Sequence, residues 1–168
     1  MKEIEIVPDG FKGERPEIRR AREKALILLS YSDYTKKRMR EKLTASGFSD
    51  LVISEVLDYL TDRRYIDEPK FLRSFSEYCV NKKLYGKRKL LGAINEKGFD
   101  RECVEENLDD ILADFDFVEI CKRHIEKAKR VDVKDRAARE KLIASLSRKG
   151  FSLAEIKTAL IQVINGEE

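Results

Sequence analysis

The chain has 168 residues, of which 42% are apolar and 40% are charged, and its formal net charge is +3. No stretch of about 18 apolar residues is present, so the sequence predicts no transmembrane helix and no membrane partner. Cys79, Cys103 and Cys121 are odd in number and lack CxxC spacing. They indicate reduced thiols in a cytoplasmic protein and argue against a disulfide framework or a zinc site.

Residues 1–15 are short, polar and without an apolar signal core, and we expect them to form a loose segment. The first predicted helix follows them and carries an apolar stripe made of Ile18, Ala21, Ala25, Leu28 and Leu29. Amphipathic spacing then continues on both sides of Gly47-Phe48. A glycine between two such runs is typical of a helix end, because it accepts a positive φ without a Cβ clash. Residues 16–64 are therefore predicted to form a three-helix unit.

The first helix of the second unit is expected to be capped by Asp67, with Pro69 in its first turn. Gly98-Phe99 then divides another pair of amphipathic runs, 51 residues after the first glycine. Gly150-Phe151 does the same 52 residues later. Self-similarity at a fixed period indicates a repeat architecture. We predict an all-α chain with three-helix repeats over residues 16–64, 65–113 and 114–166.

Two local features should accompany each Gly-Phe turn. The residues two positions after the glycines, Ser49, Asp100 and Ser152, can each cap the helix that follows. Phe48, Phe99 and Phe151 are expected to be largely buried. Short repeats of this size are close to the lower limit for independent folding, so the repeats should stack as a tandem array in which neighbours complete one another's cores.

The charges are sorted by helix, which the net charge conceals. The middle predicted helix of each repeat is basic, whereas residues 49–62 and 100–116 are rich in carboxylates. Basic helices that share one side of the array would form a positive stripe suited to phosphates or to an acidic protein groove. Alternatively, basic and acidic helices face each other across repeat boundaries as solvated ion pairs of small energetic value.

The positive stripe supplies the candidate contact residues. Tyr85 is included because an aromatic ring among cations is the mixture used for single strands, although a lone tyrosine more often packs against its own repeat. The candidates are Lys36, Lys37, Arg40, Lys82, Lys83, Tyr85, Lys87, Arg88, Lys89, Arg136 and Arg139.

No pattern typical of catalysis, of a cofactor site or of a metal site is present. His124, the one histidine, lies on an apolar helical stripe, where packing or capping is the expected role. Gly86-Lys87 lacks the remainder of a phosphate loop and follows no strand. The carboxylates between Glu102 and Asp110 circle a helix instead of converging. The sequence therefore indicates a binding protein and not an enzyme.

Over residues 20–165 the chain resembles the RecX family, small bacterial regulators of the RecA recombinase. The likeness lies in the repeats and in four stretches, which are Leu28-Leu29 with Thr35, Tyr65-Ile66-Asp67-Glu68 with Phe71, Gly86-Lys87-Arg88-Lys89, and Arg148-Lys149-Gly150-Phe151. Two positions depart from the family pattern. Arg38 replaces a frequent Glu, which removes a capping box with Thr35, and Lys87 replaces a common Pro.

The resemblance implies an elongated, curved array of three stacked three-helix repeats that binds the RecA–DNA filament as a monomer. Such a protein would limit filament growth, strand exchange, ATP hydrolysis and co-protease activity in DNA repair and the SOS response, and would bind DNA weakly on its own. Two alternatives remain open. One is a helical-repeat protein that binds nucleic acid directly without a dedicated protein partner, and the other is a helical scaffold that binds an extended peptide.

Overall fold

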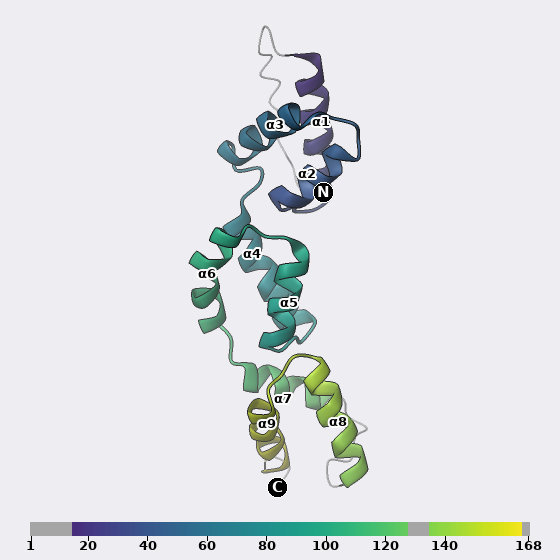
Figure 1. Cartoon of the computed structure of the whole chain (residues 1–168). Coiled ribbons are helices and arrows are strands. Elements are labelled where there is room, and N and C mark those ends of the chain that lie inside the picture. Colours follow the sequence, from purple (N-terminus) through teal and green to yellow (C-terminus); the bar gives the residue numbers. More distant parts are fainter. Residues whose placement is uncertain (1–14, 128–134, 166–168) are drawn as a thin grey trace. The chain divides into compact units, whose positions relative to one another are not determined.

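The structure, a computed structural model, describes residues 15–127 and 135–165. Within these ranges it contains nine α-helices and one five-residue π-helix, without a strand (Figure 1). The predicted all-α helical repeat is confirmed. In the same ranges, no helix is long and apolar enough to cross a membrane. The predicted loose segment up to residue 14, and residue 166 at the end of the third predicted repeat, lie outside the described residues.

The described residues form two compact units. Unit 1 comprises the residues up to Phe71 together with Lys97–Val104. Its helices α1 (Pro16–Tyr31), α2 (Lys36–Thr44) and α3 (Asp50–Asp62) pack against one another (Figure 1). The predicted stripe of α1 faces this core, which is centred on the fully buried side chains of Ala25, Met39, Leu43, Ile53 and Leu60.

Unit 2 comprises Leu72–Glu96 and the residues from Glu105 onward. It holds most of α4 (Glu68–Glu77), the π-helix η1 (Tyr78–Lys82), α5 (Lys87–Lys97) and α6 (Arg101–Ala113). It continues through α7 (Phe117–Lys127), α8 (Arg136–Arg148) and α9 (Leu153–Asn165), which pack against one another. Because the second predicted repeat is shared between the two units, the three repeat boundaries stay a prediction.

The Gly-Phe turns have the backbone geometry that the sequence predicts. Gly47, Gly98 and Gly150 have φ values of +83°, +78° and +94°, in the left-handed region that suits glycine. Phe151 is buried, as expected. Phe48 and Phe99 are only half-buried. Both lie nearer the surface, Phe48 at the margin of the first core and Phe99 against the ring of Phe71, with centroids 5.1 Å apart.

The predicted helix caps are formed in most places. The Asp67 carboxylate accepts from Lys70 N–H at 3.0 Å, and the Asp100 carboxylate accepts from Glu102 N–H at 3.0 Å. Ser152 and Glu155 form a reciprocal capping box at the start of α9. Ser49 precedes α3 but makes no side-chain cap bond.

Thr35 still caps α2 although Arg38 replaces the family's glutamate. The Thr35 hydroxyl accepts from Arg38 N–H at 3.2 Å and donates to the carbonyl of Lys97 at 3.4 Å. The Arg38 side chain instead pairs with Glu41 at 2.7 Å. The loss of the capping box thus leaves the N-cap bond itself in place.

Candidate anion-binding site

An irregular stretch of backbone in unit 2 precedes α5 and positions the first residues of the site. The α-helix α4 passes directly into the π-helix η1, a rare form that is frequent at functional sites. Leu84 follows with φ +53°, a left-handed conformation that is strained for a residue with a branched side chain. Its side chain is buried, which holds this conformation in place. Lys83 and Tyr85 are thereby positioned just before α5 begins.

The start of α5 then docks on the turn between α8 and α9. Gly86 N–H donates to the carbonyl of Lys149 at 2.8 Å, and Arg88 N–H donates to the carbonyl of Gly150 at 3.2 Å. A Cβ on Gly86 would lie 2.4 Å from the carbonyl carbon of Gly150, and a Cβ on Gly150 would lie 2.3 Å from Lys89 N. Two glycines therefore allow a backbone contact that no side chain would permit.

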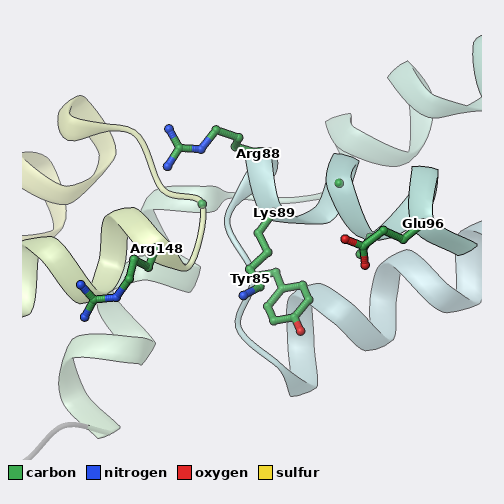
Figure 2. A pocket seen from close by; sticks show the side chains of 8 residues that line it. Tyr85, Arg88, Lys89, Glu96 and Arg148 are labelled. Carbon is green, nitrogen blue, oxygen red and sulfur yellow. The ribbon is translucent and has the colours of Figure 1, made fainter.

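This docking brings Lys149 beside the ring of Tyr85, which Lys83 and Lys89 already contact from the same stretch of chain. The ammonium groups of Lys83, Lys89 and Lys149 lie 5.7, 5.1 and 5.5 Å from the ring centroid of Tyr85. We call these four residues the Tyr85 lysine cluster. Figure 2 shows the side chain of Lys89 extending beside the ring. Each contact is within cation–π range and is worth about 0.5–1 kcal/mol at an exposed site.

A cavity of about 290 Å³ opens beside the cluster. Its lining includes Tyr85, Lys89, Arg88 and Arg148, and the two arginines come from α5 and α8 (Figure 2). One nitrogen of the Arg88 guanidinium donates to the carbonyl of Ser147 at 2.7 Å, which fixes that side chain and leaves other N–H groups for a ligand. Glu96, farther along α5, is the acidic lining residue. The arrangement is suited to binding an anion.

The sequence did not place Arg148 and Lys149 among the candidate residues. Both belong to the basic segment of the third repeat, but their role depends on a contact with residues about 60 positions earlier in the chain. In the sequence, the feature that could have pointed to Arg148 and Lys149 is their position directly before Gly150. That glycine makes the docking contact with the start of α5.

The other candidates lie elsewhere. Lys36, Lys37 and Arg40 are exposed residues of α2 in unit 1, and Lys82 is exposed at the end of η1. Arg136 and Arg139 are at the start of α8, so Arg136 is about 18 Å along the helix from Arg148. The structure therefore brings together Lys83, Tyr85, Arg88 and Lys89, with Lys87 beside them at the start of α5.

Within the described ranges, two of the candidate arginines form ion pairs. Arg40 lies 3.8 Å from Asp50, and Arg136 lies 3.0 Å from Glu140. Among the described residues, by contrast, no carboxylate is within ion-pair distance of the remaining lysine candidates. These are Lys36, Lys37, Lys82, Lys83, Lys87 and Lys89.

The residues that could suggest catalysis are packed into the fold. His124 on α7 is half-buried, and burial, followed by the charges of Lys149 and Lys127, lowers its pKa below the ordinary value. Burial and the nearby Glu155 raise the pKa of the buried Cys121 thiol to about 12, so the thiol stays protonated. In the part of the chain that the structure describes, no three His, Cys, Asp or Glu side chains could jointly hold a metal ion.

Comparison with known proteins gives a consistent result. The family model of the first three-helix domain of RecX matches residues 21–60. The chain is 28% identical over 152 residues to the regulatory protein RecX of Clostridioides difficile, covering 89% of this chain and 70% of that protein. It is 31% identical over 150 residues to the RecX of Bacillus velezensis, covering 87% of this chain.

The relatives are often longer than this chain. It spans 56% of the Bacillus velezensis protein and 54% of the RecX of Streptococcus thermophilus. The crystal structure of RecX from Lactobacillus salivarius matches with a TM-score of 0.72 and 28% identity, covering 89% of this chain and 97% of that one. A second crystal structure, of a regulatory protein RecX, has 23% identity and a TM-score of 0.69, which supports the fold.

Proposed function

The chain belongs to the RecX family, and we propose that it regulates the RecA recombinase by binding the RecA filament on DNA. In this proposal the bound protein limits filament growth and thereby reduces strand exchange, ATP hydrolysis and co-protease activity. It catalyses no reaction itself, in keeping with the names of its relatives, which are regulatory proteins. The family membership is the observation that carries the choice of RecA as target.

The exposed lysines that form no ion pair with a described carboxylate support this role. Each unit presents exposed lysines at the start of a helix, Lys36 and Lys37 on α2 in unit 1 and Lys87 and Lys89 on α5 in unit 2. A filament of RecA and DNA repeats the same protein and phosphate surfaces along its length. A protein with several such basic helix starts can make several weak contacts at once, and linked contacts raise the overall affinity far above that of each one.

The direct test adds the protein to RecA filaments formed on single-stranded DNA. We expect the ATPase rate to fall and the mean filament length, measured by electron microscopy, to shorten as the protein is titrated in. A filament whose length and ATPase rate do not change at saturating protein would contradict the proposal.

A second candidate function is direct nucleic-acid binding without a protein partner, which the Tyr85 lysine cluster favours. The two functions differ in their dependence on RecA. A direct binder would coat DNA and block RecA only in proportion to its own occupancy of the strand. A RecA regulator would act at concentrations where its binding to bare DNA is negligible. Comparing the two titrations at one salt concentration separates them.

A further inference from the structure

We infer that the Tyr85 lysine cluster and its adjoining cavity form a discrete phosphate-binding site, whose ligand is a backbone phosphate of single-stranded nucleic acid. The inference deepens the proposed function, and it rests on that function only in choosing nucleic acid as the source of the phosphate. It assigns a ligand to one part of the basic surface and adds Lys149 and Arg148 to the residues that bind it.

Among the described residues, no carboxylate compensates the charges of the cluster. All three ammonium groups are within 6 Å of one ring centroid. Any two of them are therefore no more than about 11 Å apart, close to the screening length of about 8–10 Å at moderate salt. No carboxylate of the described residues forms an ion pair with them. The repulsion among these cations is relieved when an anion binds between them.

The geometry suits a phosphate better than a carboxylate. Lysine ammonium groups act as point charges that approach from separate directions, which matches the oxygens of a tetrahedral anion. A planar carboxylate is recognised best by the parallel N–H groups of a single arginine. Here the three lysines come from three segments, before α5, within α5 and after α8. Arg88 and Arg148 line the adjoining cavity and can take further phosphate oxygens.

The cavity favours an unpaired strand. Part of its lining consists of Gly92 and Ala93, which carry no long side chain and leave space beside the lysines. A nucleotide of a single strand can turn into this space, whereas a nucleotide in a duplex is held by pairing and stacking. A basic groove with an aromatic ring is the usual platform for single strands.

The lysine cluster is specific to unit 2, because the equivalent positions one repeat earlier do not form such a cluster. Tyr34 is the repeat equivalent of Tyr85, 51 residues earlier, and it packs against the core of unit 1. Lys97, which corresponds to Lys149, lies instead over Phe71, 5.3 Å from its ring centroid. Ser32 occupies the position that corresponds to Lys83. The lysine ring is thus present around one of the two equivalent tyrosines.

The main test measures binding of a fluorescein-labelled 20-residue oligothymidylate by anisotropy. The variant Lys83→Gln/Lys89→Gln/Lys149→Gln should bind at least tenfold more weakly than the wild type. Its salt dependence should also be less steep, by about 0.7 in log–log slope for each phosphate that the protein no longer neutralises. The matched control Lys24→Gln/Lys70→Gln/Lys157→Gln removes the same charge from exposed helix surfaces. Equal weakening in both variants would overturn the inference, because it would indicate a diffuse field and no site.

Competitors distinguish the possible ligands. Unlabelled oligothymidylate should displace the probe from the wild type, a duplex of equal length should do so less well, and polyglutamate should not. Inorganic phosphate should compete only weakly, since it lacks the neighbouring nucleotide. Displacement by polyglutamate as effective as by the oligonucleotide would overturn the choice of phosphate. If inorganic phosphate or the duplex displaced the probe as effectively as the oligothymidylate does, the choice of a single strand as the source of the phosphate would be overturned.

A second pair of variants tests the docking without changing any charge. Gly86→Ala places a Cβ against the backbone of Gly150, whereas a Cβ on Gly47, in unit 1 and outside the site, meets nothing within 4 Å. We expect Gly86→Ala to weaken oligonucleotide binding at least fivefold and Gly47→Ala to leave it within twofold. Circular dichroism confirms the helix content of both. Unchanged binding in a folded Gly86→Ala variant would contradict a composite site.

The experiments give different results according to whether this inference or the proposed function is wrong. If the lysine variant binds the oligonucleotide normally while the wild type still shortens RecA filaments, the phosphate site alone is wrong. If the wild type leaves RecA filaments unchanged but binds the oligonucleotide through these lysines, the site stands and the RecA role is wrong.

Discussion

At the residue scale, the glycines of the Gly-Phe turns share a conformation but differ in their surroundings. A Cβ on Gly47 would meet no atom within 4 Å, whereas a Cβ on Gly150 would collide with the backbone of Lys89. Gly47→Ala should therefore cost only the left-handed strain, about 1–2 kcal/mol. Gly150→Ala must also separate α5 from the turn, so we expect it to cost at least about 2 kcal/mol more. Urea denaturation measures both, and equal costs would show that the backbone around Gly150 relaxes freely.

The single histidine should make stability depend on pH. Burial, then Lys149 and Lys127, lower the pKa of His124 in the folded state, while the unfolded chain titrates near pH 6.5. As the pH falls through about 6.5, the unfolded state takes up the proton first, so the folded state loses stability. We expect the melting temperature to fall between pH 7.5 and 5.5, and to fall less in His124→Gln. Identical pH profiles for the two proteins would contradict this account.

His124 should also report on ligand binding. An anion at the Tyr85 lysine cluster would offset the positive charge of Lys149, which is one cause of the lowered pKa of His124. Saturating oligothymidylate should therefore raise the pKa of His124, followed by proton NMR of the one histidine in the chain. The Lys149→Gln variant should start from a higher pKa and respond less. A lower pKa on binding would be incompatible with an anion beside Lys149.

At the element scale, a buried carboxylate joins the starts of two helices in unit 1. Glu68 is 5% exposed, and its two oxygens accept from Lys36 N–H and Asp100 N–H, each at 2.7 Å. Removing the carboxylate would leave both amides without their partner, at a cost of about 1–3 kcal/mol for each such group. We expect Glu68→Ala to lose about 2–4 kcal/mol of unfolding free energy, and Glu68→Gln to lose less because its carbonyl still accepts. Equal losses would show that the acceptor is unimportant.

Elements that depend on local sequence could be predicted, and those that depend on distant contacts could not. Asp67 and the three turn glycines are local signals, and the structure places them as the caps and helix ends that the pattern predicts. The π-helix has no comparable signal, because its extra residue per turn leaves only a small change in spacing. The lysine ring around Tyr85 required the docking of Gly86 on Gly150, which the repeat pattern does not specify. Arg148 and Lys149 were missed for this reason.

At the scale of the whole molecule, the question is whether both units engage the filament. Lys36→Glu/Lys37→Glu reverses exposed charges in unit 1, and Lys87→Glu/Lys89→Glu does so in unit 2. If both units bind, each pair should weaken inhibition of RecA ATPase, and the free-energy losses should add in the combined variant, because sites that share no partner residues contribute independently. Because both units belong to one chain, the combined variant should lose filament affinity by the product of the fold-changes that the two pairs cause separately.

The control reverses acidic residues on other helices, Asp58→Lys on α3 and Asp109→Lys on α6, and should change inhibition far less. Exposed helical charges contribute little to stability, so melting temperatures should stay close to that of the wild type in every variant. An effect confined to the unit 2 pair would assign recognition to that unit and remove the multivalent contact from the proposal. Equal effects of the acidic and basic reversals would mean that the sorted charges serve no contact with the filament, because a specific surface must distinguish one sign of charge from the other.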